Sequence, residues 1–469
     1  MKSVLMIAYF FPPEGSAGAY RPTRFVRHLP TKGWAPTVIC ADPYSYERYD
    51  PDLLGSVPSE TEIIRVRGHD LWQALQTWRG KRIRQKLVAA SAEVANQILA
   101  RQYKPFRSRI REAVRTLEAW YYQPDIARPW IHPAVQATVK LCARKHPDVI
   151  WATAGPISAW IVAQRASKIT GVPYVLDLRD PHGLNYYESE RQWPKSVKRA
   201  ISRTMYQLFK GARASVFLFN SVAQCYYRVF PAALEAAKIH IIPNGYDGTI
   251  EEVEPPVGNK CTVLYTGTVT TYRYDTLLNS LVLLKNNDPN EAKRLRLHFI
   301  GEGMEAVARK AAALDLLDIV QATGPRSQNE IARFQQEADA LLVLGRPSTM
   351  NGYELVAGAK LFEYLKRRRP IIGVLPQDET RRILLGLGVS TIADVDSPSE
   401  VVAVLRKILN AWSHGGLSSL LPDRVACEAY SADMQTIALV RALEGIPSEH
   451  PFIPGSVAMP PSLHTEFAA

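Results

Sequence analysis

The sequence predicts an α/β protein built of two doubly wound, Rossmann-like domains that face a cleft. Short runs rich in β-branched residues alternate with helical stretches through most of the 469 residues. This alternation is typical of parallel sheets that helices cover on both faces. It occurs twice, on either side of a stretch rich in Gly, Pro and Glu at 244–260, which we interpret as a hinge. The length agrees with two or three domains of ordinary size.

Thirteen strands are predicted, and we expect each to be nearly continuous in apolar residues because both faces of a parallel sheet are buried. Seven precede the hinge, at 3–10, 35–41, 62–66, 148–154, 173–178, 215–219 and 239–243. Six follow it, at 262–266, 296–300, 319–322, 340–344, 370–375 and 390–393. The apolar run near the amino terminus resembles a signal peptide, but it is β-branched and leads into a glycine loop, which favours a buried first strand.

Helix starts are clearest after the hinge. Ser327–Glu330 and Ser397–Glu400 have the spacing of capping boxes, in which a Ser hydroxyl and a Glu carboxylate satisfy the free amides of the first turn. A last helix is predicted over Ser431–Leu443. The final 24 residues contain five prolines, and we expect a disordered or surface-draped tail.

Composition excludes several classes of protein. No apolar run approaches the 18–20 residues or so of a membrane-spanning helix. The five cysteines lie far apart without a CxxC pair, so neither a disulfide scaffold nor a zinc site is expected, and a reducing cytoplasm fits best.

The net charge of +12 is concentrated in one segment. Between Arg79 and Arg115 eleven Lys/Arg stand against two acids, with aromatic residues around them. A charge run is most often a solvated helical surface, but basic residues mixed with aromatics favour an anionic membrane surface. Bases of a nucleic acid could also stack on the aromatics, but no nucleic-acid-binding motif is present and no such partner is expected.

Candidate site residues of the first half follow two strands. The first strand leads into Gly15, Ser16 and Gly18 before a helix, a turn that offers backbone N–H groups at a positive helix end. The glycines could equally serve only to make the turn. Another strand has Asp177, Arg179, Asp180 and His182 at its carboxyl end, the edge where open α/β sheets bind ligands. Asp177 and Arg179 could simply pair with each other, while Asp180 is the better candidate for binding or deprotonating a hydroxyl.

In the second half, three strand ends carry glycine on one predicted rim: Gly267 with Thr268, Gly301, and Gly324. Together they outline a cleft that fits a nucleotide. Lys360 begins a helix one turn before Glu363, so the lysine and the helix dipole would neutralise a diphosphate. Glu363 would accept hydrogen bonds from a ribose diol, although a weak surface Lys–Glu pair is the simpler alternative.

These stretches resemble the family 4 glycosyltransferases of the GT-B fold, a large retaining group that builds bacterial surface polysaccharides. The resemblance covers residues 1 to about 445 and is most specific at Ile242–Asp247 and Lys360–Leu365. It implies an acceptor-binding domain at 1–245 with a basic helical insertion at about 71–130. A nucleotide-sugar-binding domain follows at 246–410, then helical residues 411–445 that pack back on the first domain, and a Pro-rich tail at 446–469.

The resemblance also implies roles for individual residues. Glu363 matches the second glutamate of the family's Glu-x7-Glu motif, but Leu355 occupies the first position and Glu354 stands beside it. Lys360, Arg273 and Arg346 are the candidates for holding the diphosphate. The family's usual catalytic-loop histidine has no clear match, although His182 lies near Asp180. The remaining implied residues are, for the donor, Gly267, Thr268, Gly301, Gly324 and Glu354, and for the acceptor, Gly15, Ser16, Gly18, Arg21, Arg179, Asp180 and His182; Asp180, Lys360 and Glu363 are the catalytic candidates.

The expected function is transfer of a hexose, with retention, from a nucleoside-diphosphate sugar to a lipid-linked or saccharide acceptor, without a metal or other cofactor. Asp394 and Asp396 have the spacing of a metal-binding DxD pair but precede a predicted helix cap. The expected location is the cytoplasm, at the inner face of the membrane. A sugar-nucleotide epimerase of the same fold, a nicotinamide-dependent oxidoreductase and a basic non-catalytic adaptor stay open as alternatives.

Overall fold

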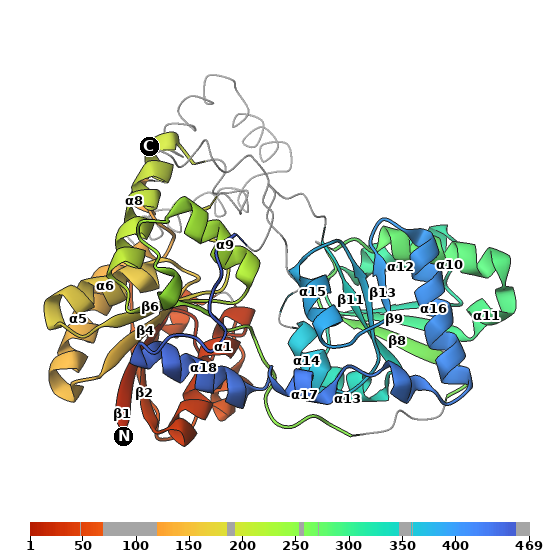
Figure 1. The fold of residues 1–469 in the computed structure, drawn as a ribbon, viewed down its shortest axis with the longest axis horizontal. Helices are drawn as coiled ribbons and strands as arrows, with labels where there is room; N and C mark the ends of the chain where they lie inside the picture. Colours follow the sequence, from red (N-terminus) through yellow and green to blue (C-terminus); the bar gives the residue numbers. More distant parts are fainter. Residues whose placement is uncertain are drawn as a thin grey trace, which may run out of the picture.

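The computed structural model describes residues 1–46, 48–68, 120–184, 193–252, 258–270, 272–346, 358 and 360–455. Two parallel sheets, each flanked by helices, lie next to each other as separate domains (Figure 1). The fold class predicted from the sequence is therefore confirmed.

The first sheet has seven parallel strands in the order β3-β2-β1-β4-β5-β6-β7. Their bounds are β1 Lys2–Ala8, β2 Trp34–Ala41, β3 Glu62–Val66, β4 Val149–Thr153, β5 Tyr174–Leu178, β6 Ala214–Phe217 and β7 Ile239–Ile241. The strand order reverses between β1 and β4. A crevice forms at such a reversal because the loops on its two sides leave in opposite directions.

The second sheet has six parallel strands in the order β10-β9-β8-β11-β12-β13. Their bounds are β8 Cys261–Thr266, β9 Leu295–Ile300, β10 Val320–Thr323, β11 Ala340–Leu344, β12 Ile371–Leu375 and β13 Ile392–Asp394. The order reverses between β8 and β11, which gives the second domain its own crevice. All thirteen predicted strands are present, with ends that differ from the prediction by at most two residues.

The helices of the first domain are α1 Ala17–His28, α5 Arg128–Lys145, α6 Ser158–Thr170, α8 Lys195–Gly211 and α9 Asn220–Val229. Those of the second are α10 Asp275–Asn287, α11 Pro289–Lys293, α12 Met304–Ala313, α13 Gln328–Glu337, α14 Lys360–Lys366, α15 Glu379–Gly386 and α16 Pro398–Ser413. Short 3-10 helices lie at Leu29–Lys32, Pro43–Ser45, Pro51–Ser56, Ala236–Lys238 and Leu417–Leu420.

Both predicted helix caps form, one of them differently from expectation. Ser327 and Glu330 make the full reciprocal capping box of α13. Ser397 caps α16 by accepting a hydrogen bond from the amide of Glu400. The carboxylate of Glu400 accepts its hydrogen bond from the amide of Asp394 instead, at 2.8 Å.

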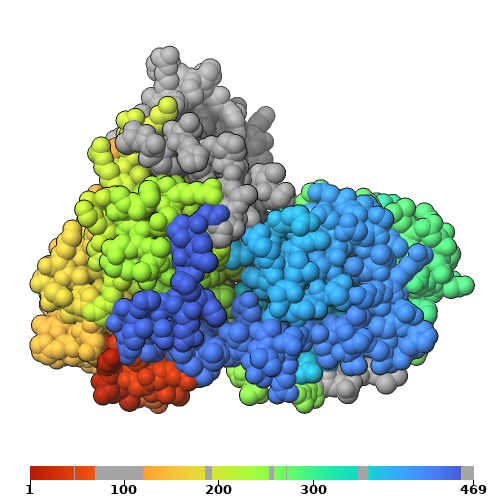
Figure 2. Space-filling model, viewed as in Figure 1, coloured from red at the N-terminus to blue at the C-terminus, as the bar shows by residue number. Residues whose placement is uncertain are grey.

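The end of the chain crosses back onto the first domain. After α17 (Arg424–Glu428), α18 (Ala432–Glu444) packs against α1, and Figure 2 shows this blue segment extending over both domains. Beyond α18 the chain lies along α9, where Phe452 is buried against Tyr227. Apolar packing is also continuous between the domains through Phe219 and Phe362. Within the described part of the chain, no helix is both long and apolar enough to span a bilayer.

Candidate functional site

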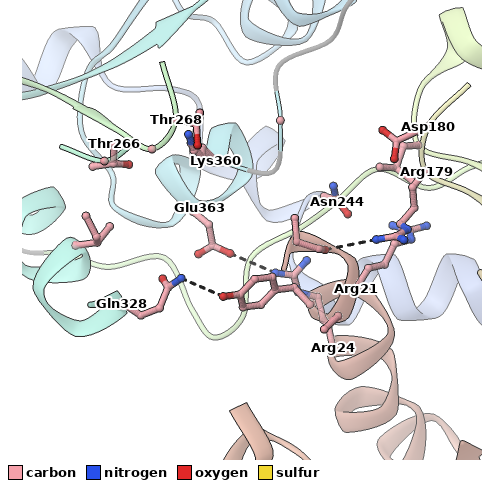
Figure 3. A pocket seen from close by; sticks show the side chains of 18 of the residues that line it. Arg21, Arg24, Arg179, Asp180, Asn244, Thr266, Thr268, Gln328, Lys360 and Glu363 are labelled. Atoms are coloured by element: carbon pink, nitrogen blue, oxygen red, sulfur yellow. Dashed lines mark hydrogen bonds and ion pairs between the residues drawn. The ribbon is translucent and has the colours of Figure 1, made fainter. Parts of the chain in front are cut away.

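A cavity of about 890 Å³ opens between the two domains. Its lining comes from α1 and from loops that follow strands in both sheets, which is where doubly wound domains bind ligands. Figure 3 shows Thr266, Thr268, Lys360, Glu363 and Gln328 on one side and Arg24, Arg179 and Asp180 on the other. The cavity is large enough for two substrate-sized groups that meet between the walls.

The second-domain wall is shaped by a close contact between a glycine and a lysine. Lys360, the first residue of α14, lies against Gly267, and a Cβ at Gly267 would overlap the lysine Nζ. Gly267 also has a φ of +115°, a conformation that L side chains rarely adopt. Its neighbour Gly301 packs on the Gly267 carbonyl in the same way. Only glycine fits these two positions, because the lysine and the backbone occupy the space of a side chain.

Two cations share this wall. Burial, with a smaller effect of the Arg346 guanidinium, lowers the pKa of Lys360 to about 8, while Glu302 opposes the shift. The Lys360 ammonium lies 5.3 Å from the ring centre of Tyr265, and Arg346 stacks at 4.9 Å on Tyr272. Two positive groups that are partly removed from water and held by aromatic rings form a site suited to a diphosphate.

Glu363 makes an ion pair across the cleft. Its Oε1 lies 3.2 Å from Nη2 of Arg24 on α1. Arg24 also binds Asp247 at 3.1 Å, and Asp247 contacts Arg27 at 3.2 Å and His28 at 3.0 Å. Burial alone would raise the pKa of Asp247, but these three partners hold it well below its ordinary range. Burial raises the pKa of Glu363, and Arg24 partly offsets this.

The glycine loop after β1 is satisfied by the chain itself. The Ser16 hydroxyl accepts from the Gly18 amide at 3.2 Å and caps α1. The buried carboxylate of Glu14 accepts from the Ser16 amide at 3.0 Å and from its hydroxyl at 2.6 Å. Gly15, Ser16 and Gly18 thus shape the turn, and Ala17 and Tyr20 line the cavity in their place. A carboxylate at this helix end disfavours a second anion there.

Arg21 and Asp177 form a buried ion pair at the base of α1. Their side chains are 3% and 0% exposed, and Nη2 lies 2.8 Å from Oδ1. The remaining donors of Arg21 reach the carbonyls of Ile242 and Pro243 at 2.9 and 3.0 Å. Asp177 therefore pairs with Arg21, and the suggested pairing with Arg179 is wrong. Although Arg21 borders the cavity, its guanidinium ties α1 to the sheet and to the start of the hinge.

The loop after β5 lines the acceptor side. Asp180 borders the cavity, and Arg179 braces the loop through the Ala154 carbonyl at 2.8 Å. His182 lies behind this wall, where its amide donates to the Asp180 carbonyl at 2.8 Å. Burial lowers the pKa of His182. Of the residues predicted here, Asp180 is thus the carboxylate placed to meet a substrate.

Several predicted donor residues lie elsewhere. Arg273 is not among the residues that line the cavity and pairs instead with Asp396 at 2.7 Å. One of the two carboxylates of the DxD-like pair is therefore engaged by an arginine. Gly324 does not line the cavity, where Pro325 and Arg326 take its place. Glu354 and most of the basic insertion, 69–119, lie outside the described residues. Within the described ranges, no group of three or more acidic, His or Cys side chains could hold a metal ion.

Sequence reasoning missed the contacts that join the two walls. Tyr20 of α1 accepts a hydrogen bond from Gln328 of α13 at 3.1 Å. Glu379 of α15 accepts from the amides of Asn220 and Ser221 at 2.8 and 2.7 Å, and thereby caps α9 from the other domain. These partners are more than 150 residues apart, so no local pattern could have paired them.

Comparison with known proteins agrees with this arrangement. Residues 17–245 match the glycosyl transferase 4-like domain family. The apo form of the lipopolysaccharide outer core galactosyltransferase WaaB shares 13% identity over 95% of this chain and 99% of that one, with a TM-score of 0.54. Sucrose-phosphate synthase from Thermosynechococcus elongatus shares 11% over 95% and 98%, with a TM-score of 0.58.

A third similar structure is a mutant of TarM from S. aureus in complex with fondaparinux, alpha-GlcNAc-glycerol and UDP. It shares 9% identity over 94% of this chain and 100% of that one, with a TM-score of 0.54. No curated protein matches the sequence. At these identities the structural likeness shows the fold, which is GT-B.

Proposed function

We propose that this chain, which carries a glycosyl transferase 4-like domain at residues 17–245 within a GT-B fold, is a glycosyltransferase that moves a hexose from a nucleoside-diphosphate sugar to a hydroxyl of a lipid-linked or saccharide acceptor. The observation that carries the proposal is the two-sided cavity. Lys360 and Arg346 lie on one wall and the Asp180 carboxylate on the other. Cations on one side suit a departing diphosphate, and a carboxylate on the other suits an acceptor hydroxyl.

The donor side supplies charge where the bond breaks. As the glycosidic bond to the diphosphate lengthens, negative charge grows on the leaving oxygen, and Lys360 and Arg346 are placed to stabilise it. Because these cations are fixed, they need no reorganisation during the reaction. We propose that they make a metal unnecessary. Glu363, one turn beyond Lys360, would hold the ribose diol.

The acceptor side is partly apolar. Leu218, Phe219 and Val222 line the cavity beside Asp180. An acceptor with an apolar portion, such as a lipid-linked sugar, would bury that portion here. Two further parts of the proposal, retention of configuration and a role in bacterial surface polysaccharide synthesis at the inner face of the cytoplasmic membrane, rest on the family resemblance.

The test follows nucleotide release from purified protein. UDP-glucose, UDP-galactose, UDP-N-acetylglucosamine and GDP-mannose are each supplied with and without alkyl glycosides as acceptor probes, and products are identified by mass. Acceptor-dependent release with a glycosylated product is the expected result. A sugar nucleotide that isomerises without acceptor would identify an epimerase, and inertness with every pair would overturn the proposal.

Two variants separate the walls. Asp180→Asn should keep nucleotide binding and lose transfer, because it alters only the acceptor side. Lys360→Met should weaken nucleotide binding and lose transfer. If Asp180→Asn transfers at the wild-type rate, the carboxylate has no part in the reaction.

A further inference from the structure

The outer helical layer of the first domain has a one-sided charge. Helices α5, α6 and α8 carry four, two and five Lys/Arg residues and contain no Asp or Glu. The basic residues are Arg128, Lys140, Arg144, Lys145, Arg165, Lys168, Lys195, Lys198, Arg199, Arg203 and Lys210. We call this surface the α5–α6–α8 face.

The face is continuous and open to solvent. α5 packs beside α6 and α6 beside α8, and together they form the flank of the molecule that points away from the second domain (Figures 1 and 2). Ten of its eleven basic residues are exposed, and Lys198 is half-buried. The charges therefore add into one positive field on one side of the protein.

The acidic residues at the rim of this face are engaged in local contacts. Glu62 pairs with both Arg144 and Lys145. Asp125 accepts from the amide and hydroxyl of Ser158 at the start of α6, and Asp148 accepts from the amide and hydroxyl of Ser3. Among the described residues, none of these three carboxylates forms an ion pair with a basic residue of α6 or α8.

Helix stability explains only part of the pattern, since four of the basic residues (Arg144, Lys145, Lys168 and Lys210) lie in last turns, where the helix dipole favours cations. The partial positive charge at a helix start favours acids there, and every helix from α10 to α16 has an acid in its first turn. The three helices of the face have none, which is also true of α1 and α9 in the same domain. Instead, Arg128 begins α5, and Lys195 and Lys198 lie in the first turn of α8. Cations at these positions weaken the helices slightly, so their benefit lies in an interaction with something else.

Exposed apolar side chains accompany the charge. Ile126 and Trp120, next to the start of α5, are 74% and 41% exposed, and Ile169 near the end of α6 is 64% exposed. We infer that the α5–α6–α8 face docks on a bilayer that contains anionic lipids. Basic side chains bind the headgroups while isolated apolar side chains enter the interface, a combination that a phosphate backbone alone would not favour.

Docking by this face also orients the cavity. α8 is the helix that connects the parallel strands β5 and β6, so it begins at the edge of the sheet where β5 ends and Asp180 lies, although fifteen residues of chain separate Asp180 from Lys195. Contact through the exposed Lys195 would therefore hold that edge near the headgroups. The orientation of the cavity matters only if the acceptor is lipid-linked, so this consequence rests on the proposed function. The docking of the face on a bilayer does not depend on that function.

The test is flotation of the full chain with vesicles of phosphatidylcholine, with and without phosphatidylglycerol. One variant combines Lys195→Gln, Arg199→Gln, Arg203→Gln and Lys210→Gln on α8. A matched control removes the same charge from exposed sites of the second domain, by Lys293→Gln, Arg296→Gln, Arg309→Gln and Arg333→Gln. A thermal unfolding scan checks that both variants fold.

Wild type and control should bind the anionic vesicles, less so at high salt, and neither should bind phosphatidylcholine alone. Each basic residue near an anionic surface contributes about fivefold to binding, so the α8 variant should bind at least tenfold more weakly. An equal loss of vesicle binding in both variants would show that binding depends on the net charge of the protein and not on this face, which would also overturn the inference. Unchanged binding by the α8 variant, absence of binding by the wild type, or displacement of the vesicles by a DNA duplex would each overturn the inference.

Discussion

Nucleotide affinity should depend on pH through Lys360. Burial holds the pKa of this lysine at about 8, well below the ordinary lysine value. A diphosphate requires the charged ammonium, so affinity should follow the protonated fraction. That fraction is about nine-tenths at pH 7 and about one-tenth at pH 9. We therefore expect roughly tenfold weaker binding at pH 9, since the phosphates themselves are fully ionised above pH 7.

The assay is calorimetric titration with UDP at pH 7, 8 and 9 and constant ionic strength, with GDP and ADP in parallel. Lys360→Met removes a charge-assisted hydrogen bond worth about 2 kcal/mol, or roughly thirtyfold in affinity. Its remaining affinity should be flat over this range. Lys360→Arg provides the control, because arginine stays charged and should remove the pH dependence while keeping part of the affinity. Equal wild-type affinity at pH 7 and 9, or wild-type behaviour of Lys360→Met, would refute the reasoning.

Three further substitutions test other parts of the site. Gly267→Ala places a methyl group where the Lys360 ammonium lies, so nucleotide affinity should fall about as far as in Lys360→Met, with about 1–2 kcal/mol of backbone strain; normal UDP binding in calorimetry would contradict this. Arg24→Gln removes the cross-cleft partner of Glu363, which is partly exposed, so about 1 kcal/mol or fivefold in UDP affinity should be lost. The loss should be greater at pH 5.5 than at 7.5, because the pKa of the Glu363 carboxyl group rises further without Arg24 and its ionised form accepts hydrogen bonds from both ribose hydroxyls more strongly than its protonated form; a pH-independent ratio of variant to wild-type affinity would count against it. Asp177→Ala leaves a guanidinium buried without its carboxylate and should cost about 3–5 kcal/mol of stability, which a denaturant titration would reveal; a loss below about 1 kcal/mol would show that the pair is dispensable.

The sequence predicted the strands well because each is a short buried run whose identity depends on its own residues. Placement of Lys360 and Glu363 on one helix was equally local. Longer-range features were not accessible: Arg21 finds Asp177 across 156 positions, and nothing near Arg273 indicates that it turns toward Asp396. For the glycine loop after β1 the sequence leaves open whether the glycines bind a ligand or only make the turn, because no local pattern shows that the adjacent Glu14 folds back onto the loop.

The contact of Glu379 with α9 has a consequence for the order of events in a catalytic cycle. The first turn of α9, which includes the acceptor-side residue Ser221, is completed by a carboxylate from the other domain. If the domains separated, the donors of this turn would exchange a charged partner for water, and the helix start would lose a cap of the kind worth about 1 kcal/mol. The acceptor wall would then lose its fixed shape. An acceptor that arrives first would meet an incomplete surface, whereas a donor that bridges both domains would complete it, so steady-state kinetics should be sequential with the sugar nucleotide binding first.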